Sequence, residues 1–287
     1  MAQELWTVRD VLTWTRDRFQ RAGIESARLD AEVLLAHALQ CQRILLYTDL
    51  ERPLDDEERQ RYRALVAGRL ERRPVAHLIG EREFWSRRFQ VNEQVLVPRP
   101  ETEHLVEQAL AQLEGRVRPR ILDVGTGSGA IAVCLAAERP DATVVATDLS
   151  ASALEVARKN AAAHDVEIRF HEGDLFAALP VDEAPFDLVA ANLPYIGFGE
   201  RDDLAPELQH EPDLALFAEE GGLAVIRRLV TDAPARLVTG GGLLLEVGQG
   251  QTEQTAQLLE AAGFDDAPAV IADLAGIPRI VAGRWAG

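Results

Sequence analysis

Apolar residues recur at helical spacing through the first part of the chain. The stripe over residues 6–19 follows Thr7, whose hydroxyl is placed to cap a helix. Ser26 and Asp55 stand in the same position before two further apolar stripes. Three amphipathic helices predict a small helical bundle, which we delimit as a domain of residues 1–76.

A different pattern follows the bundle. Two apolar stretches, residues 84–91 and 95–97, flank the dipeptide Asn92-Glu93, a spacing typical of a β-hairpin. The tripeptide Pro98-Arg99-Pro100 stiffens the chain, because proline fixes its own φ and restricts the residue before it. We therefore predict a hairpin linker over residues 77–98.

From Arg120 onward, short apolar runs alternate with helical stretches, which predicts a mostly parallel sheet covered on both faces. We expect strands near residues 120–124, 143–147, 166–171, 186–191, 242–247, 268–272 and 278–283, and helices near 129–138, 151–163, 219–236 and 250–262. Residues 197–217 are acidic and rich in turn formers, and a loop of that length beside a strand end is usually functional or mobile.

Composition narrows the function classes. The chain has 287 residues and a net charge of -17, which disfavours direct nucleic-acid binding, because phosphate contacts need clustered Lys and Arg. The six histidines are scattered, so no metal is expected. Cys41 and Cys134 lie in apolar helical patterns, as thiols do in a reducing cytosol. The beginning of the chain does not resemble a signal peptide, and no apolar run is long enough to span a bilayer. We expect a cytoplasmic monomer with no membrane contact.

A glycine-rich turn follows the strand that ends at Val124. Glycines let the backbone turn sharply and approach a ligand, and the following helix directs free N–H groups toward it. The turn consists of Gly125, Thr126, Gly127, Ser128 and Gly129. Asp148 ends the next strand, where its carboxylate can accept hydrogen bonds from both hydroxyls of a ribose. With Ala130 the turn also fits a Gly-x-Gly-x-x-Ala dinucleotide fingerprint, so these residues alone leave S-adenosylmethionine and NAD equally open.

A second acidic position ends the third strand of this region. Asp174 can accept from an adenine amino group while Leu175 or Phe176 lies against the ring. Taken alone, Asp174 after Gly173 also fits an ordinary turn.

The sequence Asn192-Leu193-Pro194-Tyr195 ends the fourth strand, beside the glycine turn. A nitrogen conjugated to a carbonyl or a ring is a poor nucleophile, and acceptors on its N–H bonds can aim its lone pair at a sulfonium methyl group. The Asn192 side chain and a backbone carbonyl of Leu193 or Pro194 are candidate acceptors, since Pro194 fixes the backbone of Leu193. Tyr195 can stack on the flat amide or base. This combination favours methyl transfer to a planar nitrogen, without a metal.

These motifs resemble those of the protein-(glutamine-N5) methyltransferases that modify bacterial class 1 peptide chain release factors. The resemblance spans essentially the whole chain, and its most specific element is Pro98-Arg99-Pro100-Glu101-Thr102-Glu103 together with Asn192-Leu193-Pro194-Tyr195. It implies a seven-stranded Rossmann-like methyltransferase domain over residues 99–287. It also implies contact of S-adenosyl-L-methionine with the glycine turn, Asp148, Asp174, Leu175 and Asn192, and of residues 192–195 with the glutamine of a Gly-Gly-Gln loop. The N-terminal helices would help to dock the release factor.

Two positions depart from the family pattern. Many relatives have proline where Leu193 stands, and some have tryptophan where Leu175 stands. Leucine at 193 is compatible if that position contributes only its carbonyl, whereas stacking on adenine is weaker with Leu175. Glu246 follows an apolar run, and the sequence does not decide whether it is structural or lines the site.

Three other functions share parts of this pattern. A nucleic-acid adenine methyltransferase uses Asn-x-Pro-Tyr but needs a basic groove. An NAD-dependent dehydrogenase explains the glycine turn but not residues 192–195. A docking protein without catalysis would leave the intact motifs unexplained.

Overall fold

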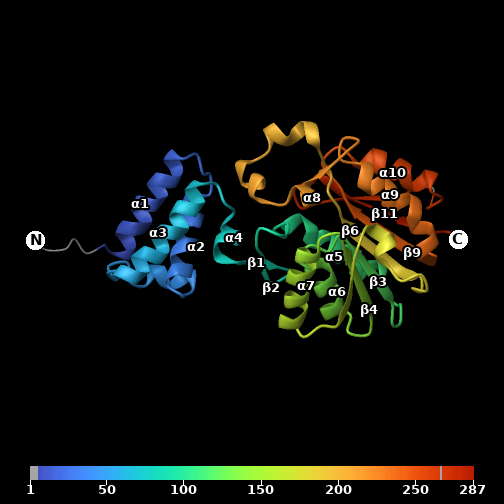
Figure 1. The fold of residues 1–287 in the computed structure, drawn as a ribbon, viewed down its shortest axis with the longest axis horizontal. Coiled ribbons are helices and arrows are strands. Elements are labelled where there is room, and N and C mark those ends of the chain that lie inside the picture. The colour runs from blue at the N-terminus through green and yellow to red at the C-terminus, as the bar shows by residue number, and fades with distance from the viewer. Residues whose placement is uncertain (1–5, 266) are drawn as a thin grey trace, which may run out of the picture. The chain divides into compact units, whose positions relative to one another are not determined.

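The computed structural model describes residues 6–265 and 267–287 (Figure 1). Its internal contacts divide the chain into two units. The helical unit comprises the described residues up to Gly80 together with Ala205–His210, and the sheet unit comprises Glu81–Leu204 and Glu211–Gly287.

The regular elements of the helical unit are helices, apart from one isolated bridge between Thr7 and Pro53. They are α1 (Val8–Arg21), α2 (Ala27–Ala38), η1 (Arg43–Tyr47), α3 (Asp56–Leu70), α4 (Val75–Ile79) and, from the later segment, η5 (Pro206–His210). Thr7 and Asp55 cap α1 and α3 as predicted, each in a reciprocal capping box. Ser26 precedes α2 but makes no capping bond, because its ψ of 20° is not the extended value that directs a side-chain oxygen at the helix N–H groups.

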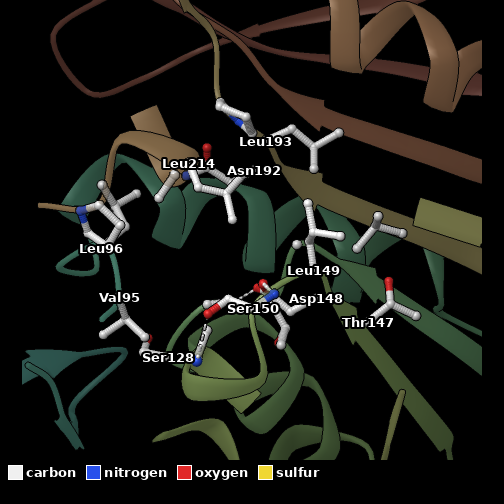
Figure 2. Close-up of a pocket in the computed structure, with 18 of the residues that line it drawn as sticks. Val95, Leu96, Ser128, Thr147, Asp148, Leu149, Ser150, Asn192, Leu193 and Leu214 are labelled. Atoms are coloured by element: carbon white, nitrogen blue, oxygen red, sulfur yellow. Dashed lines mark hydrogen bonds between the residues drawn. The ribbon is translucent and has the colours of Figure 1, made fainter. Parts of the chain in front are cut away.

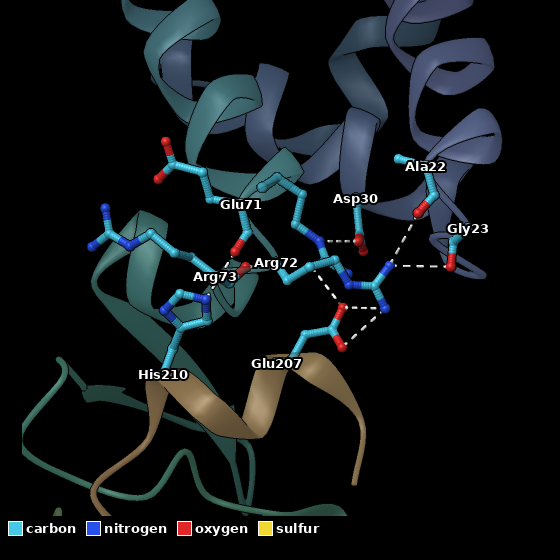
Figure 3. A network of polar contacts seen from close by, with 9 residues as sticks. Ala22, Gly23, Asp30, Glu71, Arg72, Arg73, Glu207 and His210 are labelled. Carbon is cyan, nitrogen blue, oxygen red and sulfur yellow. Dashed lines mark hydrogen bonds and ion pairs between the residues drawn. The ribbon is translucent and has the colours of Figure 1, made fainter. Parts of the chain in front are cut away.

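The segment Ala205–His210 is held in the helical unit by charged groups (Figure 3). Arg69 is 5% exposed and donates to Asp30 at 2.7 Å and to Glu207 at 2.8 Å. Arg72 donates to the second oxygen of Glu207 at 3.2 Å, and His210 donates to the Glu71 carbonyl at 2.8 Å. Because a buried guanidinium needs partners for its N–H groups, Glu207 completes the environment of Arg69.

A hairpin opens the sheet unit, but its turn is not where the sequence predicted it. Strands β1 (Glu81–Phe84) and β2 (Arg87–Gln90) pair in antiparallel register. Trp85 and Ser86 form the turn with φ of 52° and 54°, a left-handed conformation that two-residue hairpin turns require and that these residue types rarely adopt. The chain does turn at Asn92, whose carbonyl accepts from the Val95 amide at 3.2 Å, but residues 95–97 form no strand, so the predicted hairpin across Asn92-Glu93 was wrong.

Seven strands of the described residues form the main sheet, in the order β10-β11-β9-β6-β3-β4-β5. They are β3 (Arg120–Val124), β4 (Thr143–Asp148), β5 (Ile168–Glu172), β6 (Phe186–Asn192), β9 (Leu237–Glu246), β10 (Ala269–Ala272) and β11 (Pro278–Arg284). Pairing is parallel from β5 to β9, and antiparallel where β11 joins β9 and β10. This confirms the mostly parallel, seven-stranded fold. Strand β9 begins five residues before the predicted range of 242–247.

Helices cover both faces of this sheet. Successive side chains of a strand point to opposite faces, so Leu122 belongs to one buried cluster and Ile121 to the other. The first cluster includes residues of α9 (Ala224–Asp232) and α10 (Thr252–Ala261), and the second includes residues of α5 (Glu103–Gln112), α6 (Ala130–Glu138) and α7 (Ala151–Ala163). The shorter elements are η2 (Pro100–Thr102), η3 (Leu175–Ala178) and η6 (Ala233–Arg236).

The segment predicted as a long loop has its own short elements. Strand β7 (Ile196–Gly197) pairs in parallel with β8 (Phe217–Ala218). Between them lie η4 (Phe198–Asp203), η5 and α8 (Asp213–Leu216). The pairing brings the two ends of the segment together directly after Asn192-Leu193-Pro194-Tyr195, and only residues 205–210 between them belong to the helical unit.

Candidate active site

The carboxyl ends of β3, β4 and β6 open onto a cavity of about 420 Å³ in the sheet unit (Figure 2). Strand β3 lies between β4 and β6, so this is the point where successive strands are added on opposite sides, the usual ligand position in such sheets. Ten of the site residues predicted from the sequence line the cavity: Gly125, Thr126, Gly127, Ser128, Asp148, Asp174, Leu175, Asn192, Leu193 and Pro194. Gly129 and Tyr195 are not among the lining residues.

The glycine turn combines two different roles. Gly125 and Gly127 have φ of 72° and 55°, which only glycine adopts readily. A Cβ atom on Gly127 would meet no atom within 4 Å, so its open side can receive a ligand. A Cβ atom on Gly129 would instead lie 3.0 Å from the Cβ of Ala157. Gly129 therefore serves the packing of α6 on α7, and the structure gives no support to its predicted cofactor contact.

Asp123 stabilises the glycine turn through hydrogen bonds, a role that was not predicted from the sequence. Its Oδ2 accepts from the Thr126 hydroxyl at 2.6 Å and from the Ala132 amide at 3.1 Å. The residue is fully buried, and burial raises the pKa of its carboxyl to about 7. Within a strand of apolar neighbours, a buried aspartate gives no sequence signal beyond its place before the glycines.

Asp148 lines the cavity at the carboxyl end of β4. Its two oxygens accept from the Gly127 and Ser150 amides, both at 2.8 Å, which fixes the carboxylate plane (Figure 2). Each oxygen retains a lone pair, so the donor set fits a ligand with two adjacent hydroxyls. Burial raises the pKa of this carboxyl, and backbone hydrogen bonds from Ser150, Gly127 and Leu149 lower it.

Asp174 and Leu175 form the cavity wall beside β5. Arg228 donates to the Asp174 carboxylate, which is 45% exposed. Leu175 has a φ of 48°, unusual for leucine, and its side chain is buried. Phe176 is buried in the core cluster and does not line the cavity, so of the two predicted ring contacts only Leu175 is in position.

Asn192 is the last residue of β6, and its amide group is anchored. Its Nδ2 donates to the Thr102 hydroxyl at 3.1 Å. No hydrogen bond to its Oδ1 is found among the described residues, and the side chain lines the cavity (Figure 2). An acceptor oxygen is thus directed away from Thr102, the orientation that an N–H donor in the cavity would need.

Leu193 packs at the cavity wall, whereas Tyr195 packs against the core of the sheet unit. Leu193 is 4% exposed, and its Cδ2 lies 2.9 Å from the position of a Cβ on Gly125. Tyr195 is partly buried against the core, and burial raises the pKa of its phenol to about 12. The Gln251 side-chain amide donates to the Tyr195 carbonyl at 2.8 Å and to the Gly221 carbonyl at 2.9 Å. Stacking of Tyr195 on a substrate amide stays a prediction.

The Pro-Arg-Pro-Glu-Thr-Glu element lies at the same cavity. Pro98, Arg99 and Thr102 line it. Arg99 donates to Glu211, whose other oxygen accepts from the Val97 amide at 3.0 Å. Thr102 is the partner of Asn192, a contact between residues 90 positions apart that no local pattern reveals.

The described part of the chain holds no group of three or more His, Cys, Asp or Glu side chains arranged for a metal ion. Across the same residues, no helix combines the length and apolarity that crossing a membrane requires.

Comparison with known proteins gives consistent matches. Residues 10–80 match the family model described as PrmC N-terminal domain, and residues 121–210 match a methyltransferase domain model. The chain is 44% identical over 283 residues to the release factor glutamine methyltransferase of Rhodopirellula baltica, covering 96% of this chain and 95% of that protein. It is 46% identical over 278 residues to the protein of the same name from Cereibacter sphaeroides, covering 96% and 97%.

Solved structures share the fold of a large part of this chain. The Thermus thermophilus 16S rRNA N2 G1207 methyltransferase, solved with AdoMet and guanosine, matches with a TM-score of 0.52 and 21% identity, covering 71% of this chain and 49% of that one. The catalytic domain of human Mettl16 matches with a TM-score of 0.54 and 16% identity, covering 68% and 74%.

Proposed function

This chain belongs to the release factor glutamine methyltransferase family, and we propose from that premise what it does. It transfers a methyl group from S-adenosyl-L-methionine to the side-chain amide nitrogen (N5) of the glutamine in the Gly-Gly-Gln motif of class 1 peptide chain release factors, supporting translation termination. The observation that carries the proposal is one cavity in which the glycine turn, Asp148 and an anchored Asn192 meet.

The residues of the cavity suit both parts of this reaction. Gly125 to Ser128, Asp148, Asp174 and Leu175 would hold the methyl donor, which supplies a sulfonium-bound methyl group when bound. Asn192 Oδ1 and a backbone carbonyl of Leu193 or Pro194 would accept from the two N–H bonds of the glutamine amide. Fixing both N–H bonds aims the nitrogen lone pair along the S–C axis, a gain from orientation worth several kcal/mol.

The transfer balances without a metal or a strong base. The nitrogen lone pair forms the new N–C bond while the electrons of the S–C bond return to sulfur, which leaves S-adenosyl-L-homocysteine. The nitrogen gains acidity as it is methylated and releases one proton to water.

The remaining expectations belong to the same proposal. Residues 1–76 would dock the release factor and residues 99–287 would carry the chemistry, joined through residues 77–98. The net charge of -17 supports recognition of a protein rather than direct binding of nucleic acid. We take the protein to act as a monomer in the cytoplasm, away from the membrane.

A methyl-transfer assay tests the proposal. Purified protein, labelled S-adenosyl-L-methionine and an unmodified release factor are incubated, and the peptide that carries Gly-Gly-Gln is analysed by mass spectrometry. A single added methyl on the glutamine is expected. Asn192→Ala is expected to lose most of this activity while keeping its affinity for S-adenosyl-L-methionine and its melting temperature. Label on another residue, or wild-type turnover in Asn192→Ala, contradicts the proposal.

A further inference from the structure

Glu246 is a buried carboxylic acid directly beside the proposed substrate-binding asparagine. It ends β9, and Glu246 and Asn192 are register partners across the parallel pair β6–β9. Side chains at paired positions of neighbouring strands point to the same face of a sheet. Glu246 is only 3% exposed, and its Oε2 has no hydrogen-bond partner among the described residues. Burying a carboxyl group costs free energy unless hydrogen bonds or opposite charges compensate it, so its retention at this position needs an explanation.

The Thr102 hydroxyl connects Asn192 with Glu246. Its hydroxyl oxygen accepts from Asn192 Nδ2 at 3.1 Å, so its own proton is free to be donated elsewhere. Thr102 and Asn192 each lower the pKa of the Glu246 carboxyl, so both side chains favour its charged form. The Asn192 amide thus donates to the Thr102 hydroxyl, and the proton of that hydroxyl remains available to the carboxylate of Glu246, the register partner of Asn192.

The side-chain amide of Asn192 could lie in two orientations, which exchange the positions of its oxygen and its NH2 group. An anionic acceptor behind Asn192 favours the orientation with its NH2 group toward η2 and β9. The oxygen of the amide then faces the cavity. The opposite orientation would direct an NH2 group at the N–H bonds of a substrate amide and would repel them.

We propose that Glu246 is a positioning residue that, with the Thr102 hydroxyl as relay, holds Asn192 Oδ1 toward the cavity as the acceptor for the substrate nitrogen. The inference rests on the proposed function and assigns a role that the sequence left undecided. Glu246 does not itself line the cavity, whereas Thr102 and Asn192 do. It therefore acts through Asn192 and exchanges no proton with the substrate.

The ionised form of Glu246 is the one that orders the network. Burial raises the pKa of this carboxyl to about 7, with further raising by Glu101 of η2 and lowering by Arg279 of β11 and by the Thr102 and Asn192 hydrogen bonds. Tyr195, the other titratable neighbour, keeps its proton, since burial and Glu246 raise its pKa to about 12. Once protonated, Glu246 becomes a donor, and the donor chain loses its fixed direction. Turnover should therefore rise with pH through about 7.

The test is Glu246→Gln, which keeps the shape and removes the charge. With release factor and S-adenosyl-L-methionine saturating, kcat should fall about 10- to 100-fold, less than the roughly 100- to 1,000-fold cost of deleting a transition-state hydrogen-bonding group. The KM for the release factor and the Kd for S-adenosyl-L-methionine should stay within about twofold. The acid limb of the pH profile near 7 should disappear.

Three further variants separate positioning from a general loss of structure. Thr102→Val should share the kcat loss, and Thr102→Ser, which restores the hydroxyl, should recover most of it. Glu183→Gln is the matched control, because this buried carboxylate pairs with Arg120 and Arg169 before the beginning of β6, at the other end of the strands. It should change the melting temperature but not kcat.

The outcomes are distinguishable. Wild-type kcat and an unchanged acid limb in Glu246→Gln overturn the inference, as does a kcat loss that Thr102→Val does not share. If the wild-type protein itself leaves the glutamine unmethylated, the proposed function fails and the inference falls with it.

Discussion

The contact between the glycine turn and the Asn-Leu-Pro-Tyr motif yields a quantitative prediction. A Cβ on Gly125 would lie 2.9 Å from Leu193 Cδ2, whereas a Cβ on Gly127 would meet nothing within 4 Å. Both glycines have positive φ and both line the cavity. Gly125→Ala and Gly127→Ala are therefore a matched pair of variants, of which only the first introduces a steric clash with Leu193.

The magnitude follows from the geometry. An alanine at positive φ costs about 1–2 kcal/mol, of which about 0.4–1 kcal/mol is offset by the stiffer unfolded chain. Gly127→Ala should thus lose about 1 kcal/mol of unfolding free energy. Gly125→Ala must also displace Leu193, which is 4% exposed in a packed core, and an off-rotamer side chain costs about 0.5–1.5 kcal/mol more. The extra loss should lower Tm by roughly 2–4 °C per kcal/mol.

The assay measures Tm, the Kd for S-adenosyl-L-methionine and kcat for both variants. Both should bind the methyl donor more weakly, but only Gly125→Ala should also lose kcat under saturating donor, because moving Leu193 moves the adjoining Asn192. Adding Leu193→Ala should then recover part of that kcat, a coupling that a double-mutant cycle measures. Equal kcat values in the two single variants, or no recovery in the double variant, would refute the reasoning.

Three further predictions follow from contacts described above. Burial raises the pKa of Asp123 from 3.8 to about 7, so between these pH values the folded state binds a proton that the unfolded state has released, and stability falls as pH rises. The Tm of Asp123→Asn minus the Tm of the wild type should therefore grow from pH 4 to 7. A difference that stays constant contradicts this. Glu207→Gln removes a charged partner of buried Arg69 and should cost about 1–3 kcal/mol, seen as faster amide exchange in residues 205–210; unchanged exchange there refutes it. Gln251→Ala frees the Tyr195 carbonyl and should lower kcat about tenfold with unchanged affinity for the methyl donor, and a wild-type kcat would show that this contact does not position the motif.

Local patterns in the sequence were sufficient for the sheet unit's main features. Each strand that carries a predicted site residue is a short apolar run, and a side chain at the carboxyl end of such a run must face the ligand edge of a parallel sheet. Asp148 and Asn192 were located in this way, and both line the cavity. The helix caps Thr7 and Asp55 follow equally local rules.

Features that depend on pairing between distant residues were missed. The neighbourhood of Asn192, Thr102 and Glu246 arises from the register of β6 on β9 and from the position of η2, neither of which has a local signature. The hairpin turn was misplaced because positions 85 and 86 hold Trp and Ser, whereas Asn or Gly normally marks a turn with positive φ. Gly129 was assigned to the ligand because a packing glycine and a ligand-facing glycine are identical in sequence.

The path of residues 205–210 has a consequence for how the protein can be cut or recombined. The helical unit is discontinuous, since it takes six residues from between Leu204 and Glu211. No single cleavage therefore yields both units whole: a fragment that stops at Gly80 leaves Arg69 without Glu207, and a fragment that begins at Glu81 carries Glu207 without its arginines. Exchange of the N-terminal region between relatives is then a two-site exchange, in which the helices and the later segment must come from the same parent.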